Sequence, residues 1–123
     1  MRLMLLNFLW VGLAGAVGSM ARFGVGLLFP ATARPIGTLL INITGSLFLG
    51  WFLTAMGDRV SEPMRLAIAV GFVGAYTTFS TYMFESDKMM QDGQWWRASA
   101  YVVGSVALGL VAVHAGVLLG RRT

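Results

Sequence analysis

Four long apolar stretches follow one another along the chain, separated by short connections that carry most of its charged residues and prolines. They cover residues 3–29, 36–56, 64–84 and 98–119. Each stretch is long enough to cross a bilayer as a helix, which takes about 20 apolar residues. The connections are too short for a soluble domain. The pattern therefore predicts an all-α membrane protein, with four transmembrane helices in one domain over residues 1–123.

The third stretch contains a segment that is poor helix material. This segment, Gly71-Phe-Val-Gly-Ala-Tyr-Thr-Thr-Phe-Ser-Thr-Tyr82, combines glycines, hydroxyl side chains and aromatic rings. A backbone amide or carbonyl without a hydrogen-bond partner in hydrocarbon costs about 4–8 kcal/mol, judged from transfer between water and cyclohexane. Broken helices are therefore tolerated in membranes only where the freed groups are buried in protein or bind water or ions. We expect the third helix to be broken here, and the break to mark an ion-handling site.

The beginning of the chain has two interpretations. Arg2, a leucine-rich run and the small residues Ala14-Gly-Ala16 imitate a signal peptide with its cleavage site. The apolar run continues past Ala16, however, and Gly12, Gly15 and Gly18 recur at a spacing that lets helices approach closely. This pattern favours a retained packing helix. The chain has 16 glycines in all, which indicates dense helix contacts and favours oligomerisation.

Lysine and arginine are divided almost evenly between the two ends of the predicted bundle. One end carries Arg2, Arg59, Arg65, Arg121 and Arg122, and the other carries Arg22, Arg34, Lys88 and Arg97. Orientation normally follows an excess of Lys and Arg in cytoplasmic loops. A chain without a clear excess can insert in both orientations, which suits an antiparallel, dual-topology homodimer. A single orientation with weak bias remains the alternative.

Composition excludes several functional classes. The chain is 57% hydrophobic and only 11% charged, against about 25% charged residues in a soluble domain. Its net charge of +4 includes no basic cluster beyond Arg121-Arg122, so nucleic acid binding is not expected. Cysteine is absent and His114 is the only histidine, so a Cys- or His-based metal site is not expected. No phosphate-binding loop or serine-hydrolase motif is present, and we expect no enzyme activity.

Polar side chains recur at helical spacing inside the apolar stretches. They are Thr38, Asn42 and Ser46 in the second stretch, Thr77, Thr78, Ser80 and Thr81 in the third, and Tyr101 and Ser105 in the fourth. Residues four apart share one helix face. Their N–H and O–H groups suit an anion in a narrow pathway, although hydrogen bonding between helices and a polar solute are open alternatives.

Aromatic and charged residues add to this picture. Phe79 and Tyr82 are three residues apart, and their positive ring edges can stabilise a small anion, although core packing explains such pairs equally well. Arg22 either snorkels to the interface or lines an aqueous vestibule that attracts anions. Glu85 closes the third predicted helix and reaches water or a nearby cation. No Asp or Glu is expected mid-span, which argues against proton-coupled or cation-exporting transport.

In three motifs the chain resembles the small bacterial fluoride channels of the Fluc or CrcB family. The segment 71–82 is similar to the family's third-helix signature, and it is the most specific of the three. Gly37-Thr-Leu-Leu-Ile-Asn-Ile-Thr-Gly45 resembles the second-helix motif, and Gly15-Ala-Val-Gly-Ser-Met-Ala-Arg22 is similar to the opening motif. The motifs occur in the family's order and extend over essentially the whole chain.

The resemblance implies a dual-topology antiparallel homodimer with two separate fluoride pores in the bacterial inner membrane. It implies passive, selective export of cytoplasmic fluoride, which would confer fluoride resistance. It also implies a structural sodium ion at the dimer centre, held by the backbone carbonyls of Gly74 and Thr77. The family's pore residues correspond to Phe79 and Tyr82 for the aromatic pair and to Asn42, Tyr101 and Ser105 for the polar track, joined by Thr38, Ser80 and Thr81.

The chain departs from the family pattern at two positions and leaves two rival functions open. Tyr82 replaces the usual second phenylalanine, and Gly109 stands where some relatives carry a serine. One rival is a small coupled exporter, and the other is a non-conducting assembly protein whose glycine faces only pack. Pairing with a paralogous subunit is an alternative to the homodimer.

Overall fold

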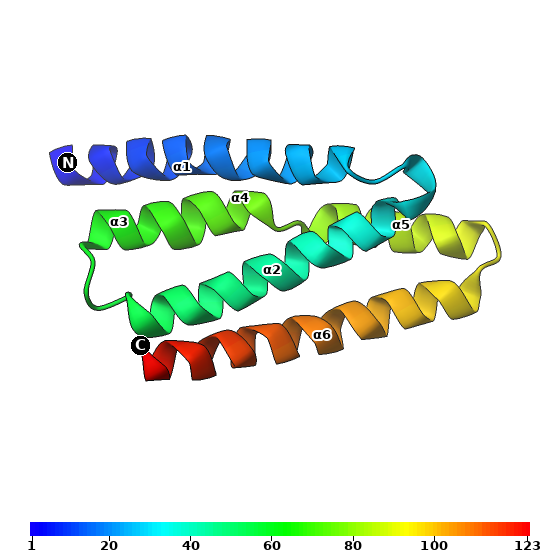
Figure 1. The fold of residues 1–123 in the computed structure, drawn as a ribbon. Helices are drawn as coiled ribbons and strands as arrows, with labels where there is room; N and C mark the ends of the chain where they lie inside the picture. The colour runs from blue at the N-terminus through cyan, green and yellow to red at the C-terminus, as the bar shows by residue number, and fades with distance from the viewer.

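The computed structural model describes residues 1–123, which form helices joined by short turns (Figure 1). The elements are α1 (Arg2–Leu27), the 3₁₀ turn η1 (Ala31–Ala33), α2 (Arg34–Ala55), α3 (Glu62–Leu66), the π-helical η2 (Ala67–Val73), α4 (Gly74–Tyr76), α5 (Phe79–Gln91) and α6 (Trp95–Arg122). Four helical stretches are long and apolar enough to cross a membrane. The prediction of an all-α chain with four such helices is confirmed.

The third and fourth helical stretches are longer than the apolar pattern predicted. The third runs to Gln91 rather than 84, and α6 begins at Trp95 rather than 98. Helical hydrogen bonding does not require apolar side chains, so α5 continues through the polar residues Asp87 and Lys88. It ends at a turn in which Gly93 adopts a φ of 75°, a backbone conformation that glycine adopts easily.

Glycines bring two pairs of elements into close contact. In Figure 1, α2 lies along α6, and α1 lies beside the row formed by α3, η2 and α4. A Cβ atom on Gly116 of α6 would overlap the Leu47 carbonyl of α2, and one on Gly18 of α1 would overlap the Phe72 carbonyl of η2. Both contacts are the close approach of backbones that small residues allow in membrane helices.

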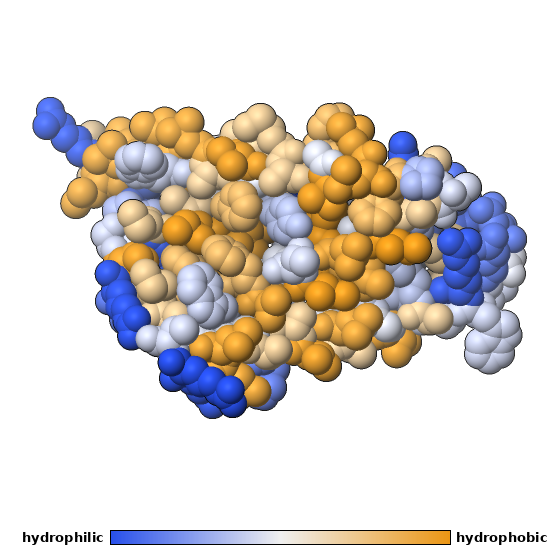
Figure 2. Space-filling model, in the orientation of Figure 1, coloured by the Kyte–Doolittle hydropathy of each residue, from blue (hydrophilic) through white to orange (hydrophobic).

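The surface of the chain is apolar in the middle and charged at its ends. Figure 2 shows an orange central zone, with the blue charged residues gathered at the two ends of the long axis. Only 20 of the 123 residues are buried within the isolated chain. Trp95 and Trp96 are exposed at the start of α6, as expected for side chains at a membrane–water interface.

Candidate functional site

The candidate site is centred on two residues that interrupt the third membrane-spanning stretch. Thr77 has φ −79° and ψ 158°, and Thr78 has φ −147° and ψ 117°, so both are extended. Helix α4 ends before them and α5 begins after them. The Thr78 hydroxyl caps α5 by accepting a hydrogen bond from the Thr81 amide at 3.2 Å, and it donates to the Thr81 hydroxyl at 3.0 Å.

Asn42 of α2 binds the interruption through both ends of its amide. Its Nδ2 donates to the Thr78 carbonyl at 3.0 Å, and its Oδ1 accepts from the Thr78 N–H at 2.8 Å. Thr78 is buried, and buried backbone groups must find partners. Asn42 therefore supplies the hydrogen bonds that a broken helix needs inside a membrane.

Two backbone carbonyls beside the interruption are released from helical bonding. The Thr78 N–H, which would bond the Gly74 carbonyl in a continuous helix, donates to Asn42 instead. The Thr81 N–H, which would bond the Thr77 carbonyl, donates to the Thr78 hydroxyl. The Thr77 carbonyl accepts a long contact of 3.4 Å from Arg22 Nη1. These are oxygen ligands of the kind that a hard cation prefers.

Glu85 of α5 joins two of the predicted polar-track residues. Its Oε1 accepts a hydrogen bond from the Thr38 hydroxyl at 3.0 Å, and its Oε2 accepts from the Tyr101 hydroxyl at 2.7 Å. Sequence reasoning placed Glu85 at the closing end of the third helix and did not predict these partners. Because α5 continues to Gln91, Glu85 lies on the helix rather than at its end. The feature of the sequence that could have placed Glu85 beside the other polar residues is its spacing of four from Thr81, which puts both on one helix face.

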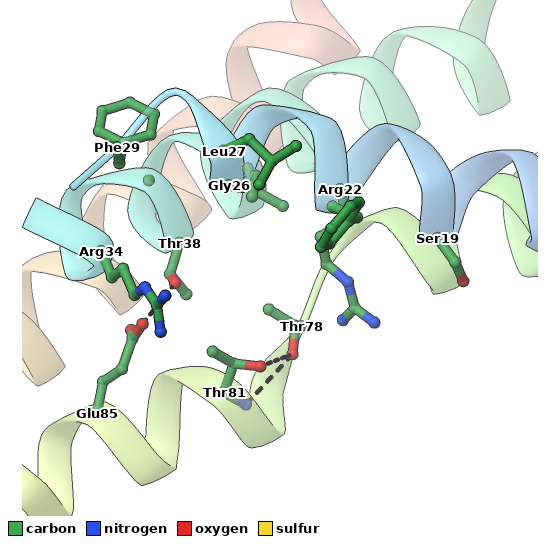
Figure 3. Close-up of a pocket in the computed structure, with 13 residues that line it drawn as sticks. Ser19, Arg22, Gly26, Leu27, Phe29, Arg34, Thr38, Thr78, Thr81 and Glu85 are labelled. Atoms are coloured by element: carbon green, nitrogen blue, oxygen red, sulfur yellow. Dashed lines mark hydrogen bonds between the residues drawn. The ribbon is translucent and has the colours of Figure 1, made fainter. Parts of the chain in front are cut away.

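A cavity of about 430 Å³ opens between α1, α2 and α5, and we call it the vestibule. Its polar lining includes Arg22, Arg34, Thr38, Thr81 and Glu85. Figure 3 shows Arg34 and Thr38 from α2 and Glu85 from α5 gathered on one side, with Arg22 from α1 lying apart near the extended segment. Arg22 lines this cavity, and its role in attracting anions stays a prediction.

A second cavity of about 470 Å³ lies on another side of the interruption, and we call it the break cavity. Asn42, Phe79, Tyr82, Ser105 and Gly109 line it. The Ser105 hydroxyl is buried without a hydrogen-bond partner. This cavity combines an unpaired hydroxyl, aromatic rings and a largely apolar wall, which is an environment that would strengthen a polar contact with a desolvated anion.

Aromatic rings meet edge to face beside the break cavity. The Phe79 and Tyr82 ring centroids lie 6.0 Å apart at 72°, and those of Tyr82 and Tyr101 lie 5.2 Å apart at 79°. The Tyr82 hydroxyl donates to the Val102 carbonyl at 2.6 Å, so its added donor is used within the protein. Phe79 is 74% exposed in the isolated chain, so one side of its ring is uncovered.

The predicted residues are therefore brought together in two groups around Thr78, which lines both cavities. Arg22, Thr38 and Thr81 line the vestibule, and Asn42, Thr77, Phe79, Tyr82 and Ser105 line the break cavity. Tyr101 contacts both groups through Glu85 and Tyr82. Ser80 is exposed and lines neither cavity, so its predicted pore role has no geometric support within the single chain.

Comparisons with known proteins point to one family. Residues 9–117 match the family described as CrcB-like protein, Camphor Resistance (CrcB). A relative from Chloroflexus aurantiacus, named fluoride-specific ion channel FluC, is 44% identical over 94% of this chain and 95% of its own length. Proteins from Acidobacterium capsulatum, named fluoride-specific ion channel FluC, and Geobacillus kaustophilus, named fluoride-specific ion channel FluC 2, are each 43% identical. Those matches cover 95% and 89% of this chain, and 98% and 88% of the relatives.

Proposed function

The chain belongs to the CrcB family, and we propose that it is a passive fluoride channel which works as an antiparallel homodimer with two pores. It is a multi-pass membrane channel and not an enzyme. The observation that carries the proposal is the interrupted third stretch, whose backbone is held by Asn42 between the vestibule and the break cavity. Such an arrangement in a membrane is expected where an ion is handled.

Each wall of the proposed pathway offers groups suited to a small anion. Arg22 adds a positive charge to the vestibule, which raises the local concentration of anions. Beyond Thr78, the unpaired Ser105 hydroxyl and the ring edges of Phe79 and Tyr82 replace water around the anion. Fluoride is small and strongly hydrated, so closely spaced donors are needed to offset its dehydration. Asn42 orients the backbone between the two cavities.

Exposed groups near the interruption support a second copy of the chain. The hydroxyls of Thr44 and Tyr76 lie 2.9 Å apart on the surface, and Gly74 and Phe79 are also exposed. Polar groups in a membrane helix normally face protein or water rather than lipid. An antiparallel partner would cover this region, and the near-equal charge of the two ends supports such an arrangement.

The released carbonyls of Gly74 and Thr77 fit the oxygen ligands of a structural sodium ion. Because Gly74 is exposed in the single chain, a partner could supply the same two carbonyls and complete the coordination. A bound sodium ion would hold the two interrupted helices together by attracting their carbonyl oxygens. Replacing sodium with N-methylglucamine should then lower fluoride efflux, whereas unchanged efflux would contradict a structural role.

The first test is efflux from liposomes that contain the purified protein, read with fluoride and chloride electrodes in parallel. We expect fast fluoride release with chloride retained. Phe79→Ile should slow release by about twofold to tenfold, since an aromatic contact is worth roughly 0.5–1.5 kcal/mol. Phe8→Ile is the matched control, because Phe8 is similarly exposed but lies outside both cavities. Release of neither ion by the unmodified protein would refute the channel.

The position of Glu85 keeps a coupled exporter as the second candidate. This carboxylate lies within a membrane-spanning stretch and accepts two hydroxyl hydrogen bonds. Acids in such positions often carry protons in transporters. A pH-sensitive dye inside the liposomes separates the two functions. An exporter would move protons in fixed proportion to fluoride, whereas a channel would move fluoride under a clamped voltage with no such proportion.

A further inference from the structure

A third cavity of about 510 Å³ lies at the end of the bundle where η1, the last turns of α5 and the start of α6 meet. We call it the antechamber, and its charged lining consists of Arg34, Lys88 and Arg97 together with Glu85 and Asp92. It adjoins the vestibule and shares no lining residue with the break cavity. None of its basic residues other than Arg34 lines the vestibule or the break cavity.

The antechamber is electropositive. Its three basic side chains outnumber its two carboxylates, which leaves one net positive charge. The 28-residue helix α6 begins at its wall, with no acidic residue in the first turn and no side-chain cap. A helix N-terminus adds roughly half a positive charge. Arg97 donates to the Gln94 side chain at 3.1 Å, so Gln94 orients Arg97 without neutralising it.

The antechamber and the vestibule share a wall. Arg34, Thr81 and Glu85 line both cavities. Figure 3 shows Arg34 beside Glu85, whose one dashed hydrogen bond in that view goes to Thr38, so the guanidinium is not held by the carboxylate there. The two cavities therefore adjoin at Arg34, Thr81 and Glu85.

We propose that the antechamber is an outer binding site for a small free inorganic anion and supplies that anion to the vestibule. The inference rests on the proposed channel function, and it assigns Lys88 and Arg97 as residues that raise the rate of anion entry. The shared wall favours a diffusible anion over a lipid phosphate, because the cavity leads inward to polar groups rather than to the apolar surface.

The effect of Lys88 and Arg97 on the rate of anion entry depends on how strongly salt screens their charges. At about 10 mM ionic strength the Debye length is roughly 30 Å, so Lys88 and Arg97 act on anions well outside the cavity. At about 1 M salt it is roughly 3 Å, and their long-range attraction disappears. Electrostatic focusing by such clefts changes entry rates by about 10-fold to 1000-fold overall. We expect neutralising both residues to slow fluoride entry by about tenfold at low salt, and by less than about twofold at 1 M.

The experiment measures fluoride efflux at a concentration far below saturation, where entry limits the rate. It compares the double variant Lys88→Gln/Arg97→Gln with Arg121→Gln/Arg122→Gln, which removes the same charge from the opposite end of α6. The charge-conserving variant Lys88→Arg/Arg97→Lys should behave as the unmodified protein. Gel filtration of each purified variant checks that the dimer remains folded.

Five outcomes decide the proposal. The proposal is supported if fluoride efflux at low salt falls only in Lys88→Gln/Arg97→Gln and recovers at 1 M salt. Equal efflux in both double neutralisations, or a loss that persists at 1 M salt, overturns it. A loss seen only in liposomes containing anionic phospholipid reassigns the cavity to lipid phosphate and also overturns it. If the unmodified protein releases no fluoride, the channel function itself fails, which is a distinguishable result.

Discussion

Replacing Asn42 with alanine should loosen the interruption of the third membrane stretch. The substitution removes the acceptor of the Thr78 N–H and one donor to the Thr78 carbonyl. An unsatisfied buried group costs about 1–3 kcal/mol, and a lost hydrogen bond about 0.5–1.5 kcal/mol. The break cavity beside Thr78 holds about 470 Å³, so water can replace part of the loss. The two costs together run from about 1.5 to about 4.5 kcal/mol, and the lower end, about 1.5 kcal/mol, is therefore the expected destabilisation.

Thermal unfolding of the detergent-solubilised protein, followed by fluoride efflux of the same preparation, measures this effect. Ser46→Ala is the matched control for the unfolding temperature, because Ser46 lies one turn further along α2 and makes no hydrogen bond to Thr78. We expect a lower unfolding temperature for Asn42→Ala only, and efflux of Asn42→Ala at least tenfold slower than that of the unmodified protein. Equal unfolding temperatures for the two variants, with Asn42→Ala efflux equal to that of the unmodified protein, would refute the role of Asn42 in holding the extended segment.

Three further predictions follow from the same geometry. Tyr82→Phe keeps the ring edge but loses the 2.6 Å hydrogen bond to the Val102 carbonyl, so the free energy of unfolding should fall by about 1 kcal/mol while efflux stays within about twofold. A tenfold loss of efflux would show that the hydroxyl contacts the anion directly. Gly109→Ser adds a hydroxyl where a Cβ meets open space, and efflux should rise; unchanged efflux would place this position outside the pathway. Gly116→Ala should reduce the yield of folded protein in gel filtration, because its Cβ would overlap the α2 backbone of the same chain. Gly104→Ala, whose Cβ meets open space, should not; equal yields would contradict this packing.

The amino-acid sequence by itself determined the class of this protein and the location of its candidate site. Four apolar stretches of about 20 residues favour four helices in a bilayer, since a helix satisfies all of its backbone hydrogen bonds within one segment. The glycine, threonine and aromatic residues between Gly71 and Tyr82 pointed to the segment that contains Thr77 and Thr78, whose backbone is extended. The helical spacing of Thr38 and Asn42 placed both on one face of α2.

Only the tertiary structure decided which partners these polar groups take. Spacing along one helix says which side chains share a face, but it says nothing about which groups of another helix they meet. Asn42 was expected to line a pore, and its amide binds the Thr78 backbone across 36 positions of sequence. Thr38 and Tyr101 were expected to face an anion, and both donate to Glu85.

The cavities and their connections depend on packing in the same way. Thr78 lines two cavities, and Glu85 lines the vestibule and the antechamber, because α5 packs against both α2 and α6. Their volumes depend on how closely the helices approach, and glycines such as Gly18 and Gly116 set that approach through backbone contacts. Many of the lining residues could be named from the sequence, but a cavity between helices exists only once the helices are packed together.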